Sequence, residues 1–169
     1  MEMQYAEARS YCHMLLLCRK GIQKSIDIFR KKQLKQQTEM LKKVYTTFDP
    51  DGDRLTKMDR MEIPFVKVRW GKQDDTFMLE RPQAWIKTFV QALIIYKSIV
   101  GDVKYAWIIY LYSRGHDVGT VATHYNVTRT TIYKEIDRLK TILVLVAVQN
   151  RLITIVKNQA PELDEEGRE

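Results

Sequence analysis

Residues 117–136 read DVGTVATHYNVTRTTIYKEI, and this stretch decides the fold that we expect. Asp117 is a good N-cap for a short helix, because its side chain can accept hydrogen bonds from the first helical turn. Asn126 tolerates a left-handed backbone, and Val127 supplies one aliphatic side chain at the corner. Thr128 can then cap a second helix. The pattern predicts two helices joined by a tight turn, which is the arrangement of a helix-turn-helix.

The two predicted helices have distinct inner and outer faces. Ala122 is small enough to let them cross closely, while Ile132 and Ile136 face inward. Cations and short hydroxyls at a helix start can contact base edges and phosphates. On this basis we predict that double-stranded DNA is bound by Thr128, Arg129, Thr130, Thr131, Tyr133, Lys134 and Arg138. Three ordinary packed helices with no such role are the alternative.

The stretch resembles the helix-turn-helix of sigma-70 region 4. The shared features are an aliphatic-Ala pair, a turn of Gly or Asn followed by an aliphatic residue and Ser or Thr, and a Thr-aliphatic pair that opens the recognition helix. Here they are Val121-Ala122, Asn126-Val127-Thr128 and Thr131-Ile132. Small phage late-gene transcription regulators of the ArpU and RinA type are similar in length and also place such a motif near the C-terminus. The resemblance covers about residues 85–145.

This resemblance implies a sequence-specific DNA-binding transcription regulator of a phage or prophage, and an activator rather than a repressor. It also implies RNA polymerase as a candidate partner. A phage packaging protein of the small terminase type is the alternative, since such proteins combine a helix-turn-helix with an oligomerising helical region. The long helix expected after Leu143 departs from the short tail usual in region 4.

Charge is unevenly distributed along the chain. The formal net charge is +7 at pH 7, yet the segment 161–169 carries five acidic side chains against Arg168. Of the 28 basic and 21 acidic side chains, 27 and 16 therefore lie outside this acidic tail. Such a surplus on a folded body favours a polyanionic partner, although basic proteins of other kinds also reach it. The tail is either a solubilising end or a competitor of DNA for the basic face.

Residues 1–60 form a predicted N-terminal helical region and linker. Apolar residues recur at spacings of three and four over residues 3–47, and Gly21 is expected to end one helix and begin another, which gives either a hairpin or a kink. From Arg19 to Lys43 nine Lys or Arg stand against two acidic residues. This basic segment is either a solvated face or an auxiliary phosphate-contacting surface. Another protein is a further candidate partner of these helices.

Residues 61–81 form a predicted β-hairpin. Val66, Val68 and Trp70 alternate with Lys67 and Arg69, which is typical of a two-faced strand. A polar break follows, and residues 76–80 can return as a second strand. Residues 82–160 form the predicted DNA-binding domain, in which Pro82 opens a helix and Gly101 ends it. Further helices are predicted at about 102–113, 117–125 and 128–158.

The last predicted helix carries an aliphatic stripe. Its members follow one another at spacings of four and three: Leu139, Leu143, Val146, Asn150 and Ile153. Such a stripe suits a coiled coil or an antiparallel helix pair, and one Asn within it fixes the register and the number of partners. The stripe either pairs two protomers into a homodimer or packs against the N-terminal helices of its own chain.

Signatures of catalysis are missing from the sequence. The histidines have no cysteine or carboxylate at metal-ligand spacing, and there is no Gly-rich phosphate loop or nucleophile elbow. Asp49, Asp51 and Asp53 cluster without a partner base, which leaves a metal-dependent nuclease as an alternative. We expect no catalytic residues, no cofactor and no bound metal.

The longest apolar run, residues 142–148, is far shorter than the roughly 20 residues that a spanning helix needs. No secretion signal is recognisable, and Cys12 and Cys18 are spaced as reduced thiols. We therefore expect a cytoplasmic protein of a bacterial host cell, without a membrane partner. The expected fold is mainly α, with a helical N-terminal region, a small β-hairpin and a C-terminal helix-turn-helix that has a long final helix.

Overall fold

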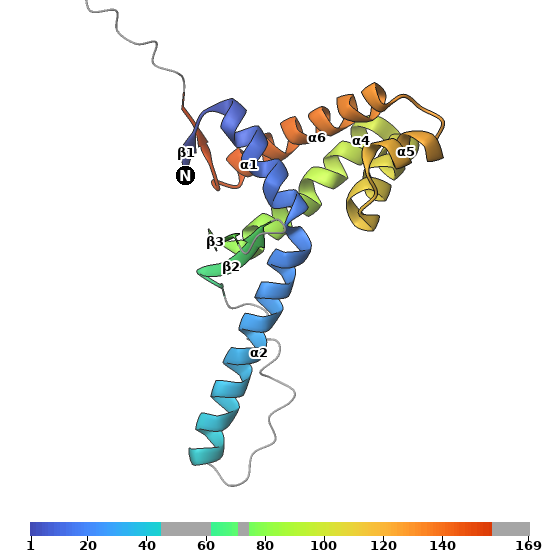
Figure 1. Cartoon of the computed structure of the whole chain (residues 1–169). Coiled ribbons are helices and arrows are strands. Elements are labelled where there is room, and N and C mark those ends of the chain that lie inside the picture. Colours follow the sequence, from blue (N-terminus) through green and yellow to red (C-terminus); the bar gives the residue numbers. More distant parts are fainter. Residues whose placement is uncertain (45–61, 71–74, 157–169) are drawn as a thin grey trace, which may run out of the picture.

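A computed structural model describes residues 1–44, 62–70 and 75–156. The fold is mainly α-helical with a small antiparallel hairpin, as predicted (Figure 1). The helices are α1 (Tyr5–Leu17), α2 (Arg19–Val44), α4 (Pro82–Arg114), α5 (Val118–His124) and α6 (Arg129–Gln149). The strands are β1 (Glu2–Met3), β2 (Phe65–Trp70), β3 (Asp75–Glu80) and β4 (Thr154–Ile155). The polar linker around residues 49–60 and the acidic tail lie outside the described residues.

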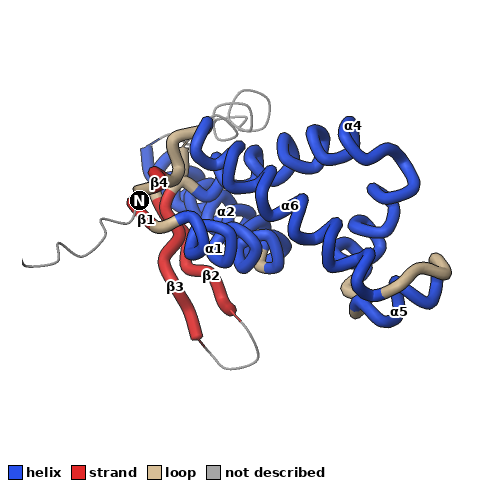
Figure 2. Tube along the Cα trace, turned by 90° about the horizontal axis from the view of Figure 1, so that it is seen from above, coloured by secondary structure: helices blue, strands red, loops and turns tan. Residues whose placement is uncertain are grey.

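Helix α6 lies between two neighbours, α4 and α1. Both run antiparallel to it. Asn150, the C-cap of α6, bonds to the start of α4, whereas Glu135 bonds to later positions of α4. Likewise Tyr5 of α1 bonds to Thr141 and Arg9 to Asp137. Because two helices cover it, its buried face is wider than a coiled-coil seam and includes Ile142, Val144 and Ala147. Figure 2 shows the helix-turn-helix end of the molecule opposite to the end that carries the strands.

Gly101 interrupts α4, as predicted. Its φ of 79° and ψ of 177° are not helical, so that two helical stretches meet there at a kink. Gly21, by contrast, lies inside α2, and the break between α1 and α2 is at Cys18 instead. A glycine ends a helix when its backbone turns left-handed, and Gly21 does not. Ile22 N–H still donates to Cys18 O at 2.9 Å, so the break is a local irregularity rather than a hairpin.

The hairpin of β2 and β3 packs against α2. Val66 and Val68 are buried, as their alternation predicts, and Ser25 of α2 donates to the backbone oxygen of Lys67 at 2.9 Å. Trp70 was expected on the same buried face but is exposed. Trp70 pairs with Asp75, the last described pair between β2 and β3, where the strand extends past the buried core.

Helix α6 is shorter than predicted. It ends at Gln149 rather than near residue 158, and Arg151 adopts a left-handed φ of 55°. Arg151 N–H donates to Val148 O and Leu152 N–H to Ala147 O, which together close the helix end as a Schellman motif. The chain then forms β4, which pairs in parallel with β1 at the N-terminus. β-Branched residues at 153–156 favour this extended pairing over another helical turn.

The aliphatic stripe of α6 lies in the core of its own chain. Leu139, Leu143, Val146 and Ile153 are all buried without a second protomer. Asn150 Nδ2 donates to Thr88 Oγ1 and to Gln91 Oε1, each at 2.8 Å. The burial favours the intramolecular alternative over a homodimer seam, but only in part as predicted: α6 packs against the N-terminal helix α1 and also against α4, which the sequence did not indicate. Helical periodicity identifies an apolar face, but it does not say whose helix will cover it.

The two cysteines are free thiols, as predicted. Cys12 lies on the buried face of α1 and is fully buried, and burial raises the pKa of its thiol to about 12. A thiol with so high a pKa carries almost no thiolate at neutral pH and is therefore unreactive. Both cysteines serve as small apolar side chains of the core.

A buried carboxylate joins α4 to α6. Glu135 is 3% exposed, and it accepts hydrogen bonds from Tyr96 Oη at 3.0 Å, from Lys104 Nζ at 2.8 Å and from Arg138 Nη1 at 3.0 Å. Burial raises the pKa of this carboxyl, but the bonds from Lys104 and Tyr96 and the charge of Arg138 outweigh burial, so that the pKa lies below its usual value. We call these four residues the Glu135 cluster.

Replacing the buried carboxylate should destabilise the fold far more than replacing an exposed one. Glu135→Ala leaves Tyr96 and two cations without their shared acceptor, and we expect it to lower the free energy of unfolding by about 2–4 kcal/mol. The matched control is Asp137→Ala on the same helix, whose side chain is 58% exposed and pairs with Arg9. That change should cost less than about 1 kcal/mol. Equal losses in urea denaturation would contradict the assigned role of Glu135.

The same site predicts a pH dependence. Because the folded-state pKa of Glu135 is lowered, its stabilising effect is complete above the unfolded carboxyl pKa of about 4.3 and is lost as the pH falls through the folded value. The difference in unfolding free energy between the wild type and Glu135→Gln should therefore shrink below about pH 4. A difference that grows on acidification would show that the carboxyl is protonated in the native state.

Candidate nucleic-acid interface

Helices α5 and α6 form a helix-turn-helix, and the second half of α4 completes a three-helix unit with them. Val121 and Ala122 of α5 are buried where the helices meet, and Ile132 and Ile136 of α6 pack opposite them. These are the inward-facing residues that the sequence predicts. The unit lies at one end of the molecule, so that the first turns of α6 face outward (Figure 1).

The turn between α5 and α6 is a Schellman motif. Val127 N–H donates to Ala122 O at 2.9 Å, and Asn126 N–H donates to Thr123 O at 3.2 Å. Asn126 has the left-handed φ of 53° that this motif requires. The side chain of Val127 packs against the core, and its N–H is the group that bonds to the carbonyl of Ala122. The two bonds satisfy the carbonyl groups at the end of α5 and fix the direction in which α6 leaves.

Both helices of the motif are capped as predicted. Asp117 Oδ1 accepts a hydrogen bond from Thr120 N–H at 3.1 Å, and Thr128 Oγ1 accepts one from Thr131 N–H at 3.2 Å. The hydroxyl oxygens of Thr128 and Thr131 also lie 2.8 Å apart. In the structure these two threonines begin α6. Both were also predicted to contact DNA, and that contact stays a prediction.

Two histidines enclose a tyrosine beside the motif. The ring of Tyr110, near the end of α4, stacks on His116 at 4.2 Å and on His124 at 4.6 Å between ring centroids. The guanidinium of Arg114 lies 5.2 Å from the same ring. The stack joins α4, the loop that follows it and α5, and so holds α5 in place. Sequence reasoning missed it, because the three rings are brought together only by the fold.

Four of the predicted contact residues are exposed on the first two turns of α6. They are Arg129, Thr130, Tyr133 and Lys134, which we call the recognition face. Further along the helix, Arg9 of α1 bonds to Asp137 and Tyr5 bonds to Thr141, while Asp137 and Arg138 remain exposed. Arg138 was predicted to bind DNA with the others; its side chain is 47% exposed, and its guanidinium bonds to Glu135. Because this ion pair holds it one turn beyond Lys134, the recognition face is defined without it, and its contact with DNA stays a prediction.

The basic segment of α2 begins beside the C-terminal end of α4, the end that leads into the helix-turn-helix. Arg19 Nη2 donates to Ser113 Oγ at 2.9 Å, and Lys20 Nζ donates to Ser113 O at 2.8 Å. The first two cations of the segment thus hold α2 against α4. From there α2 extends away from the body, carrying exposed lysines at positions 24, 31, 32 and 35 (Figure 1).

Comparison with protein-family models, with curated proteins and with solved structures finds no match to the chain. Among the residues that the structure describes, no helix is both long and apolar enough to cross a membrane.

The turn should depend on the residue at position 126. Asn126→Val places a β-branched side chain in a left-handed conformation, and we expect it to cost about 1–2 kcal/mol of stability. Asn126→Gly, which allows the same conformation, should cost a few tenths of a kcal/mol at most. Thermal unfolding followed by circular dichroism measures both. If the two variants unfolded at the same temperature, the left-handed turn would not be a constraint on the fold.

Proposed function

We propose that this protein is a sequence-specific DNA-binding transcription regulator, with α6 as its recognition helix. One observation carries the proposal: a capped helix leaves a helix-turn-helix and presents Arg129, Thr130, Tyr133 and Lys134 to solvent, while the opposite face of the same turns is buried. In helix-turn-helix proteins the N-terminal residues of the second helix contact base edges in the major groove. These four exposed residues occupy that part of α6.

The chemistry of the recognition face suits DNA. Arg129 and Lys134 can donate to guanine O6 and N7 or to phosphate oxygens, and Thr130 can bond to several bases. Tyr133 is 55% exposed, which is unusual for so large a ring and leaves it free for contact with a base or a sugar. None of the four side chains is needed for the packing of α6, since the buried face lies on other positions of the helix.

The basic surplus of the chain supports the same proposal. A protein that replaces the counterions of several phosphates gains affinity that falls steeply with added salt. The exposed lysines of α2 are candidates for such contacts, in addition to the recognition face. The activating role, the late-gene target and contact with RNA polymerase rest on the resemblance to sigma-70 region 4 and to phage late-gene regulators.

The decisive experiment is a selection from a randomised pool of double-stranded DNA with the purified full-length chain. We expect a defined motif to be enriched, followed by binding to that motif at least tenfold tighter than to a scrambled duplex in fluorescence anisotropy. Enrichment of no motif, with equal affinity for both duplexes, would reduce the activity to charge-driven binding and would contradict the proposal.

Variants of the recognition face should then separate base contact from charge. Arg129→Ala is expected to cost about 1–3 kcal/mol on the selected site if it reads a base, with a smaller loss on scrambled DNA. Lys134→Ala should weaken binding to both duplexes and lower the slope of log affinity against log salt by about one.

The control is Lys87→Ala, which removes the same charge from an exposed position near the other end of α4. It should leave the affinity for the selected site within about twofold of the wild type. If Lys87→Ala weakened binding as much as Arg129→Ala and Lys134→Ala do, α6 would not be the recognition helix.

A further inference from the structure

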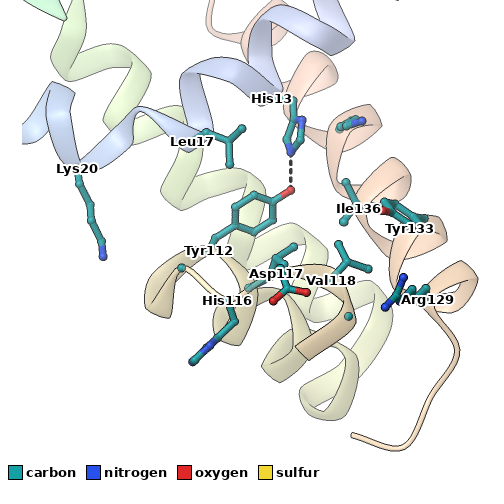
Figure 3. A pocket seen from close by; sticks show the side chains of 14 residues that line it. His13, Leu17, Lys20, Tyr112, His116, Asp117, Val118, Arg129, Tyr133 and Ile136 are labelled. Carbon is teal, nitrogen blue, oxygen red and sulfur yellow. Dashed lines mark hydrogen bonds between the residues drawn. The ribbon is translucent and has the colours of Figure 1, made fainter. Parts of the chain in front are cut away.

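A pocket of about 740 Å³ lies between α1 and the helix-turn-helix. Its walls come from α1, the start of α2, the end of α4, the start of α5 and the first turns of α6 (Figure 3). The volume falls within the range of about 300–1,000 Å³ that is typical of small-molecule sites. In the close view, the hydroxyl of Tyr112 points across the pocket to His13, and Arg129 and Tyr133 stand at the side formed by α6 (Figure 3).

The lining combines apolar surface with aromatic rings. The aliphatic part consists of Leu17, Leu111, Val118 and Ile136. His13 Nε2 and Tyr112 Oη lie 2.6 Å apart. Burial lowers the pKa of His13 to about 4, with a further contribution from the charge of Lys140, and burial raises the pKa of Tyr112. Both groups are therefore neutral at pH 7, and this part of the wall carries no charge.

The charged groups of the pocket are mostly cations. Lys20, Arg129 and Lys140 line it, whereas Asp117 is the one carboxylate among the described lining residues. That carboxylate is occupied in capping α5, where it accepts hydrogen bonds from Thr120. The Arg129 guanidinium lies close to Gly119, since a Cβ atom at position 119 would be 3.0 Å from Arg129 Nη2. Lys140 Nζ also lies 3.6 Å from Asp137 Oδ1, just outside the lining, and Lys20 Nζ donates to Ser113 O. The pocket thus offers an apolar interior and a rim on which cations outnumber carboxylates.

We propose that this pocket binds a small organic anion: a compact apolar group, aromatic or aliphatic, that bears one carboxylate, sulfonate or phosphate. The apolar group lies against Leu111, Val118 and Ile136, and the negative charge meets Arg129 and Lys140. Charge complementarity selects an anion, and the rings and aliphatic walls select an organic one over sulfate or inorganic phosphate.

The same occupant would regulate DNA binding, a consequence that rests on the proposed function. Arg129 and Tyr133 belong both to the pocket and to the recognition face. An anion held by Arg129 competes with a base or phosphate for the same guanidinium. Because coupling between two sites is reciprocal, the ligand lowers the affinity for DNA by the factor by which DNA lowers the affinity for the ligand.

Ligand binding is tested first, without DNA, on the full chain. The probe is 1-anilinonaphthalene-8-sulfonate, and its neutral counterpart is N-phenyl-1-naphthylamine, which has the same ring system without the sulfonate. We expect saturable binding of one sulfonate probe per chain in equilibrium dialysis, at least fivefold tighter than binding of the neutral probe. Equal affinities, or binding that does not saturate, would overturn the proposal.

Variants of the lining test whether the probe binds in this pocket. Lys140→Met removes a cation of the rim and should weaken binding of the sulfonate about fivefold, with little effect on the neutral probe. Lys87→Met makes the same change on α4, outside the pocket, and should have no effect. Val118→Trp fills the pocket and should abolish binding of both probes. Unchanged binding of the sulfonate in Lys140→Met would place the probe elsewhere and overturn the site.

The regulatory part is tested with the DNA selected by the wild type. Saturating sulfonate probe should weaken binding to this duplex at least threefold, and Lys140→Met should reduce that effect. A probe that occupies the pocket but leaves the DNA affinity unchanged overturns the regulation and leaves the binding site in place. A failure of the DNA selection instead overturns the proposed function, while the dialysis results still decide the site.

Discussion

The Glu135 cluster is the interaction on which the arrangement of the molecule depends. Helix α6 buries one face along its length, and its first two turns present the recognition face on the other side. A buried carboxylate must face its donors, and Tyr96 and Lys104 both lie on α4. This requirement fixes the rotation of α6 about its own axis, because a helix turned by one residue would leave the charge without partners. The same rotation turns Tyr133 and Lys134 outward.

Helix α1 sets the limits of the exposed surface. It is held along α6 mainly by buried apolar side chains such as Ala8, Cys12 and Leu15, since its exposed ion pair between Arg9 and Asp137 contributes at most about 1 kcal/mol. Its bonds to Asp137 and Thr141 place it beside the turns of α6 that follow the recognition face. His13 and Leu17 of the same helix line the pocket, so that the surroundings of the recognition face and the pocket are shaped by the same packing.

Most of the local structure could be predicted from the sequence. Three helices end in a left-handed residue: α4 at Gly115, α5 at Asn126 and α6 at Arg151. The first two residues are typical of that conformation, and the predicted boundaries there were right, as were the N-caps Asp117 and Thr128. Arginine gives no such signal, and the predicted end of α6 was several residues too late. The β1–β4 pairing that replaces the last turns joins the two ends of the described chain, which no local pattern can indicate.

The sequence by itself therefore determined the helices, their caps, the turn at Asn126 and the set of residues that α6 has to bury, because these depend on neighbours within a few positions. Only the tertiary structure decided what covers each face. It buried Leu139, Leu143, Val146 and Ile153 within one chain, bonded Asn150 to α4, and paired Arg138 with Glu135. It also brought His13 to Tyr112 across 99 positions of sequence. A side chain's residue type states what kind of partner it needs, but which partner it meets depends on distances that only the folded chain defines.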